Sequence, residues 1–258
     1  MEWTGKTILI TGASSGIGLE TATAFLEKGA LVYMNGRNSE KLEKTAAKLK
    51  PLPGIAASLP GDVSIVSECE RMLRQVTDNT AGLDVLVNAA GIWVEGRSDA
   101  MTEAQWDTTM NINAKGTFFM CRYAIPLLEA SGGAIVNVCS DSGLMGNKEA
   151  VVYCASKGAV TLITKSLAVE LAARGIRVNA VCPTEVDTPM LEKAFQESEY
   201  DNREDYYQTM LKHYPQGESA RFIRPREVAE TILFLASPAA QAITGACLPI
   251  DFGMTAGY

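Results

Sequence analysis

Side chains that usually bind metals are scarce in this sequence. Its 258 residues include one histidine, His213, and six cysteines, none of which forms a Cys-x-x-Cys pair. A structural zinc site takes about four ligands at short spacings. We therefore expect no metal site, and we expect the cysteines to be reduced and mostly buried.

Long apolar runs and excess positive charge are also missing. No uninterrupted apolar stretch approaches the ~20 residues that span a bilayer, and the segment from Met1 to Lys6 lacks a signal-peptide pattern. The net charge is −7 and the sequence pI is about 4.9. An acidic surface argues against non-specific binding to nucleic-acid phosphates. We expect a cytoplasmic protein with no membrane or nucleic-acid partner.

What the sequence does contain is a regular alternation of short apolar runs with longer helical stretches. The apolar runs cover residues 7–11, 31–34, 84–88, 134–138 and 176–181, and helical stretches include residues 16–28 and 149–173. This alternation predicts βαβ units and a parallel sheet, and nearly continuous apolar strands indicate helices on both faces. With 47% hydrophobic residues, we expect one α/β domain over residues 1–258, built on a doubly wound parallel sheet.

One segment differs in composition from the rest. Residues 188–225 are polar, acidic and rich in aromatic side chains, which favours a helical insertion between the last two strands. Such an insertion is either a solvated helical hairpin or a lid over a substrate. Its place after the carboxyl end of a strand, where α/β sheets bind ligands, favours the lid.

The most informative residues are Ser140, Tyr153 and Lys157. Tyr153 and Lys157 are four residues apart and therefore share one face of a helix. A lysine ammonium at that distance would favour the phenolate and bring the tyrosine pKa closer to neutrality, so that the tyrosine could exchange a proton with an alcohol oxygen. Ser140 could orient the same oxygen, and Ser142 is its rival. These groups suit alcohol–carbonyl interconversion but supply no hydride.

A glycine-rich turn after the first strand offers a place for a hydride-carrying cofactor. Residues 11–18 read Thr-Gly-Ala-Ser-Ser-Gly-Ile-Gly, and their glycines would let the backbone approach a pyrophosphate at the N-terminus of the following helix. The turn residues expected to bind the cofactor are Gly12, Ser14, Ser15, Gly16, Ile17 and Gly18.

The end of the second strand bears on which dinucleotide is bound. NAD sites usually have an acid there, but this chain has Gly36, followed by Arg37 and Asn38. An arginine can pair with a 2′-phosphate through two hydrogen bonds, which favours NADP(H) over NAD(H); a solvated arginine in a turn is the alternative. After the next two strands, the expected contacts to the adenosine are Asp62, Val63, Asn88, Ala89 and Gly91.

Together these elements resemble the short-chain dehydrogenase/reductase family over nearly the whole chain. The shared elements, in order, are residues 11–18, Asp62-Val63, residues 88–91, Asn113, Ser140, Tyr153-Cys154-Ala155-Ser156-Lys157 and residues 183–188. The resemblance implies a Rossmann-like sheet of about seven strands with a small helical substrate loop. Two positions depart from the family's pattern: Thr184 follows Pro183 where glycine is usual, and Phe252 interrupts an Asp-Gly-Gly sequence.

The resemblance also implies a role for each matching residue. Tyr153 would be the general acid/base, Lys157 would hold the nicotinamide ribose, and Ser140 would bind the substrate oxygen. Asn113 would interrupt a helix and organise a water-linked proton relay; Asn111 competes with it, but Asn113 fits the Asn-x-x-Gly pattern. The residues implied around the nicotinamide are Tyr153, Lys157, Pro183, Val186 and Thr188.

The expected reaction is therefore hydride transfer between a secondary alcohol and a ketone or aldehyde, catalysed by an NAD(P)-dependent oxidoreductase that acts on CH–OH groups. An NAD-preferring alcohol or polyol dehydrogenase, a 3-oxoacyl-type reductase and a non-catalytic dinucleotide-binding regulator remain alternatives. The small-molecule alcohol or ketone stays open. The expected substrate contacts are Trp93, Ser140, Ser142, Tyr153, Glu185 and Met190. By resemblance, the chain would form a homotetramer or homodimer through the helical regions 102–130 and 149–173.

Overall fold

Seven strands form one parallel sheet in the computed structural model, which describes residues 2–256. The strands are β1 Thr7–Thr11, β2 Leu31–Gly36, β3 Ile55–Pro60, β4 Val85–Asn88, β5 Ala134–Val138, β6 Arg177–Pro183 and β7 Cys247–Ile250. Their order across the sheet is β3-β2-β1-β4-β5-β6-β7, and every pair is parallel. The prediction of a doubly wound parallel sheet of about seven strands is confirmed.

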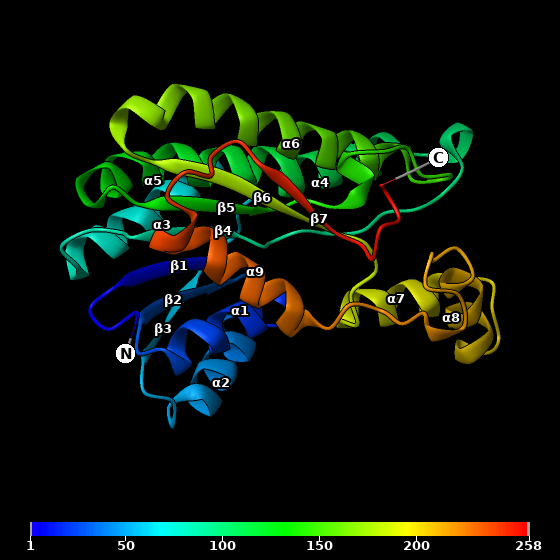
Figure 1. Ribbon diagram of the computed structural model, residues 1–258, viewed down its shortest axis with the longest axis horizontal. Helices are drawn as coiled ribbons and strands as arrows, with labels where there is room; N and C mark the ends of the chain where they lie inside the picture. The colour runs from blue at the N-terminus through cyan, green and yellow to red at the C-terminus, as the bar shows by residue number, and fades with distance from the viewer. Residues whose placement is uncertain (1, 257–258) are drawn as a thin grey trace.

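Helices cover both faces of this sheet. They are α1 Gly16–Glu27, α2 Ser39–Leu49, α3 Val66–Asn79, α4 Glu103–Met110, α5 Thr117–Ser131, α6 Val151–Leu171, α7 Pro189–Glu197, α8 Arg203–Leu211 and α9 Pro225–Ala236, with a π-helical turn, η2 Asn111–Gly116, between α4 and α5. In Figure 1, α4, α5 and α6 lie on one side of the sheet, and α1, α2 and α9 lie on the other. No helix within residues 2–256 is long and apolar enough to cross a bilayer.

The apolar side chains of the strands pack into two hydrophobic cores, one on each face of the sheet. Ile8 and Ile10 of β1 pack with α1 and α9, whereas Leu9 between them packs in the opposite layer with α3 and α5. Successive side chains of a strand point to opposite faces, so a strand with a helical layer on each side must be apolar at every position. Most of the cysteines are also buried, namely Cys69, Cys121, Cys139 and Cys182, and all six are free thiols.

The segment between β6 and α9 forms the predicted helical insertion. Helices α7 and α8 stand beyond the end of the sheet, beside the ends of β6 and β7 (Figure 1). A bridge between Val186 and Ile223 closes the base of the insertion. Its aromatic rings mostly pack on one another, since Tyr206 contacts Phe195, Tyr200 and Tyr207. These contacts hold α7 and α8 together through a cluster of partly exposed aromatic rings.

Candidate active site

A cleft of about 910 Å³ opens at the carboxyl ends of the strands, beside the point between β1 and β4 where the order of the parallel strands reverses. This is the crevice in which doubly wound sheets bind ligands, and its volume lies in the upper part of the ~300–1,000 Å³ range of small-molecule and cofactor sites. Almost all of the residues predicted from the sequence line it: Gly12, Ser14, Ser15, Gly16, Ile17, Gly18, Arg37, Asn38, Asp62, Val63, Ala89, Gly91, Trp93, Ser140, Ser142, Tyr153, Lys157, Pro183, Glu185, Val186, Thr188 and Met190. Asn88 and Asn113 lie behind the wall.

The glycine-rich turn has a conformation that other residues would strain. Gly12 and Gly16 have φ angles of +67° and +55°, in the left-handed region that favours glycine. A Cβ atom at Gly12 would lie 2.8 Å from Ala90 Cα, and one at Gly18 would collide with the Gly12 carbonyl oxygen. The turn leads into α1, whose N-cap has no side-chain hydrogen bond and whose first turn has no acidic residue. Free N–H groups and the positive end of the helix dipole thus face the cleft, which fits a pyrophosphate.

Two cations border the cleft at the end of β2. Arg37 is largely exposed, and its Nη1 lies 4.0 Å from Asp62 Oδ2, a loose pair that leaves most of the guanidinium free. Lys41 also lines the cleft, one turn into α2, where its backbone N–H donates to the Asn38 side chain at 2.8 Å. The sequence prediction included Arg37 and Asn38 but missed Lys41, which only the first turn of a helix capped by Asn38 brings to the same side.

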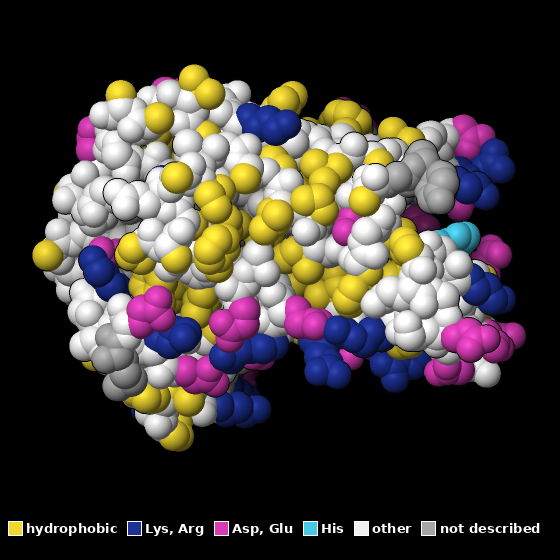
Figure 2. Space-filling view, in the orientation of Figure 1, with side chains coloured by type: hydrophobic (Ala, Val, Ile, Leu, Met, Phe, Trp, Pro, Cys, Tyr) yellow, Lys and Arg dark blue, Asp and Glu magenta, His cyan; other side chains and the backbone are white. Residues whose placement is uncertain are grey.

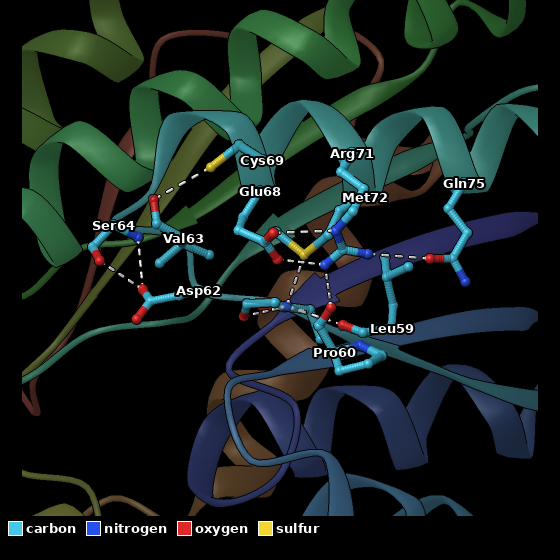
Figure 3. A network of polar contacts seen from close by, with 12 residues as sticks. Leu59, Pro60, Asp62, Val63, Ser64, Glu68, Cys69, Arg71, Met72 and Gln75 are labelled. Atoms are coloured by element: carbon cyan, nitrogen blue, oxygen red, sulfur yellow. Dashed lines mark hydrogen bonds and ion pairs between the residues drawn. The ribbon is translucent and has the colours of Figure 1, made fainter.

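Hydrogen bonds fix the Asp62–Val63 segment against α3. Asp62 Oδ1 accepts from the backbone N–H and the hydroxyl of Ser64, at 2.9 and 2.7 Å, and Cys69 Sγ donates to the Val63 carbonyl (Figure 3). Arg71 donates to the Pro60 carbonyl at 2.6 Å and so ties the end of β3 to the same helix. Asp62 lines the cleft, and its second oxygen, which has only the loose pair with Arg37, could accept from an adenine amino group.

The groups suited to proton transfer meet at the floor of the cleft. Ser140, Tyr153 and Lys157 are all buried, with at most 7% of each residue exposed. Ser140 follows β5 and caps a short 3₁₀ turn, while Tyr153 and Lys157 stand on the first two turns of α6. The Ser140 hydroxyl donates to Asp141 Oδ1 at 2.7 Å and accepts from the Ser142 N–H at 3.2 Å. Ser142 lines the cleft too, but its hydroxyl accepts from Asn147.

Burial has the largest effect on the pKa values of Tyr153 and Lys157. It raises the pKa of the Tyr153 phenol, against an opposing hydrogen bond from Ser140, and lowers the pKa of the Lys157 ammonium. The direction for Tyr153 is opposite to the one predicted from the four-residue spacing. Burial outweighs the lysine charge, and Lys157 Nζ stands 5.7 Å from the centre of the Tyr153 ring, where it donates to the Val138 carbonyl at 2.8 Å.

Asn113 and Asn88 hold the wall of the cleft instead of lining it. Asn113, in the π-helical turn, accepts from the Ile92 N–H at 2.9 Å and donates to the Ile92 carbonyl and to the Ser156 hydroxyl, both at 3.0 Å. It thereby ties the loop after β4 to α6, next to Tyr153. The Asn88 side chain turns into the core and donates to Asn137 Oδ1 at 2.9 Å. Its predicted contact with the cofactor would therefore have to come from the backbone.

The outer end of the cleft carries acidic and aromatic side chains. The Trp93 ring packs on Tyr153 with their centres 4.5 Å apart, and Trp93 Nε1 donates to Glu95. Further residues there that the sequence analysis left out are Glu95, Asp141, Lys148, Thr184, Tyr206, Met210 and His213. Most come from loops or from the insertion, where no spacing rule links a side chain to the site.

Comparisons with known proteins agree with this geometry. The family model described as enoyl-(acyl carrier protein) reductase matches residues 12–255. A 3-oxoacyl-[acyl-carrier-protein] reductase of Thermotoga maritima is 38% identical over 98% of this chain and 99% of its own length. A D-threitol dehydrogenase of Mycolicibacterium smegmatis is 38% identical over 97% of this chain and 93% of its own.

A solved structure gives the same result. A short-chain type dehydrogenase/reductase from Mycobacterium marinum superposes with a TM-score of 0.89 at 33% identity, covering 99% of this chain and 98% of that one. The sequence match and the shared architecture both extend over nearly the whole chain. This protein is thus an oxidoreductase that belongs to the short-chain dehydrogenase/reductase family.

Proposed function

We propose that this protein catalyses reversible hydride transfer between NADP(H) and a secondary alcohol/carbonyl pair. The observation that carries the proposal is the convergence of Ser140, Tyr153 and Lys157 on the floor of the same cleft that receives the Gly12–Gly18 turn. A bound nicotinamide dinucleotide would supply or accept the hydride. Everything else that the reaction needs must come from the chain's own donors.

Tyr153 is the general acid/base in this mechanism. In the direction of reduction its hydroxyl donates a proton to the developing alkoxide, and in the direction of oxidation the phenolate accepts the proton of the alcohol. The Ser140 hydroxyl turns from Asp141 to the same oxygen and stabilises its negative charge. Lys157 holds the ribose hydroxyls and keeps a positive charge near the tyrosine. Asn113 positions these groups through Ile92 and Ser156.

Tyr153→Phe tests this assignment. We expect kcat/KM to fall by about 10²–10⁴, the usual contribution of a positioned acid/base, while the affinity for NADPH, measured by isothermal titration calorimetry, stays close to that of the wild type. Tyr123→Phe, on α5 and outside the cleft, is the matched control. An unchanged rate in Tyr153→Phe would refute the assignment.

The preference for NADP(H) rests on Arg37 and Lys41. Both face the end of β2, where the adenosine ribose lies in a doubly wound sheet, and charged donors to a 2′-phosphate are worth about 1.5–3 kcal/mol each. We expect Arg37→Ala and Lys41→Ala each to lower kcat/KM for NADPH by roughly 10–100-fold and to leave that for NADH nearly unchanged. Lys44→Ala, on the same helix but paired with Glu40 outside the cleft, is the control. A wild-type enzyme that prefers NADH would overturn this part of the proposal.

We also propose that the insertion acts as a lid and that the chain forms a homo-oligomer. Several insertion side chains line the cleft, among them Met190, Tyr206 and Met210. The outward face of α6 carries Leu162 and Val169, which are 65% and 83% exposed. Apolar side chains on one helix face favour an interface between copies of the chain.

A further inference from the structure

Three carboxylates line the outer end of the cleft at graded depths. Asp141 is buried beside Ser140, Glu185 is half-buried after β6, and Glu95 lies at the mouth, next to Trp93. None of the three forms an ion pair within residues 2–256. Their negative charge therefore faces whatever enters the cleft.

Each carboxylate is held by one oxygen and keeps the other free. Asp141 Oδ1 accepts from Ser140 and from the Ser142 N–H at 2.7 Å. Glu185 Oε2 accepts from the Tyr214 hydroxyl at 2.6 Å, with a further donor in Thr184. Glu95 Oε2 accepts from Trp93 Nε1 at 3.2 Å. The second oxygen of each carboxylate makes no hydrogen bond to any residue in the described part of the chain. Each of these three oxygens can therefore accept a hydrogen bond from a ligand.

The burial of Asp141 makes it costly for its second oxygen to have no hydrogen-bond donor. Its residue is 6% exposed, yet its unpaired oxygen opens to the cleft beside the groups proposed to handle the substrate oxygen. Burial, and to a smaller extent the nearby Glu185, raises the pKa of Asp141, and desolvation with the charges of Glu149 and Glu185 raises that of Glu95. A carboxylate without donors is costly in such a place, and a ligand hydroxyl offsets that cost.

The arrangement of the three carboxylates favours a polyol over a cation as the ligand of the cleft. No three acidic, histidine or cysteine side chains within residues 2–256 converge closely enough to hold a metal ion. One ammonium would need carboxylates that meet at a point, whereas these differ in depth, from the buried Asp141 through the half-buried Glu185 to the exposed Glu95. A chain of hydroxyl groups presents donors in such a succession, and the Trp93 ring offers an apolar face to its C–H groups.

We propose that the substrate is an uncharged, polyhydroxylated alcohol or its carbonyl form, whose hydroxyls donate to Asp141, Glu185 and Glu95 in turn. The proposal rests on the proposed hydride transfer at Tyr153 and specifies its substrate class. It disfavours anionic substrates, because a carboxylate or phosphate at the outer end of the cleft would meet three like charges against one lysine, Lys148. The thioester of an acyl carrier, which has no hydroxyls near its reacting carbon, lacks the donors that these oxygens need.

The test compares four probes under the same conditions with NADP⁺: D-sorbitol, D-gluconate, cyclohexanol and aminocyclohexanol. We expect kcat/KM to be highest for D-sorbitol and at least about tenfold lower for D-gluconate, which differs by one carboxylate. A higher value for cyclohexanol or D-gluconate than for D-sorbitol would overturn the proposal, and a higher value for aminocyclohexanol would show a cation site instead. Absence of turnover with all four, together with none on any ketone, would refute the proposed function itself.

Glu95→Gln isolates the role of the carboxylate. The amide can still accept from Trp93 but carries no charge, so we expect the ratio of kcat/KM for D-sorbitol over D-gluconate to fall roughly tenfold. Glu199→Gln, an exposed position on the insertion that does not line the cleft, is the matched control and should leave the ratio unchanged. An unchanged ratio in Glu95→Gln, with normal NADPH binding, would contradict a role for Glu95 in selecting the substrate.

Discussion

At the scale of single residues, burial affects the pKa of Tyr153 more than its four-residue spacing from Lys157 does. The spacing of Tyr153 and Lys157 places them on one face of α6, as predicted, but it does not determine where the ammonium lies. Lys157 Nζ bonds to the Val138 carbonyl beneath the ring, and the buried phenol has a raised pKa. A raised pKa keeps the Tyr153 phenol protonated at neutral pH, the form that the proposed mechanism uses in the direction of reduction.

This pKa direction predicts how the rate depends on pH. Because alcohol oxidation needs the phenolate, kcat/KM for oxidation should keep rising with pH beyond the ordinary tyrosine value of about 10. The same raised pKa favours the folded state below pH about 10, and that stabilisation is lost as the pH rises further, so circular dichroism at each pH must accompany the assay. A plateau already reached at neutral pH would contradict the raised pKa.

Single residues also show where prediction from sequence ends. The Asn88 side chain turns into the core and bonds to Asn137, an orientation that the sequence did not reveal because the end of a strand does not show which face a polar residue takes; the predicted approach of the 88–91 backbone to the cofactor stays a prediction. Glu95 and Asp141 could not be identified, since loop residues follow no periodicity. The placement of Tyr153 beside Lys157 could be predicted, because the fixed geometry of a helix links residues four apart.

At the scale of elements, short secondary-structure elements position the side chains of the site. The continuous apolar runs predicted strands at β1 and β5 with their observed bounds, because such runs have few other uses in a sheet covered on both faces. The π-helical turn between α4 and α5 was predicted only as an interruption by Asn113. Its hydrogen bonds to Ile92 and Ser156 depend on three segments far apart in the chain.

Asn113→Ala should therefore damage both stability and catalysis. It leaves the Ile92 N–H and carbonyl without partners, which should cost roughly 2–4 kcal/mol in the free energy of unfolding, and it should lower kcat by loosening the loop beside Tyr153. Urea denaturation and steady-state kinetics measure the two effects. Asn111→Ala is the matched control, because that side chain makes no hydrogen bond within the described residues. Equal losses in both variants would contradict the positioning role of Asn113.

At the scale of the whole molecule, the fold leaves apolar side chains exposed on several elements. The helical regions predicted to form an interface correspond to α4–α5 and α6, but Val160, Leu167 and Leu171 of α6 are core residues. The exposed apolar side chains of these helices are Trp106 of α4, Phe118 of α5, and Val151, Leu162 and Val169 of α6. On the face shown in Figure 2, hydrophobic side chains also gather over β7 and its neighbours. Leu248 of β7 is 37% exposed.

Substitution on α6 tests the proposed oligomer. In a Leu162→Glu, Val169→Glu double variant, two charges on the outward face should disrupt an interface there, so the mass measured by light scattering after size exclusion should fall below that of the wild type. Ile55→Glu, at an exposed apolar position on the edge strand β3, should leave the mass unchanged. A wild-type monomer, or an unchanged mass in the double variant, would contradict an interface through α6.

The central claim is that this cleft transfers a hydride between a nicotinamide dinucleotide and a carbonyl carbon while Tyr153 supplies the proton. The most direct measurement uses NADPH deuterated at the transferred position, a ketose as the acceptor and mass spectrometry of the alcohol formed. The account predicts one deuterium on the new carbinol carbon with the wild-type protein and almost none with Tyr153→Phe over the same time. Alcohol formed without deuterium, or equal transfer by Tyr153→Phe, would contradict it.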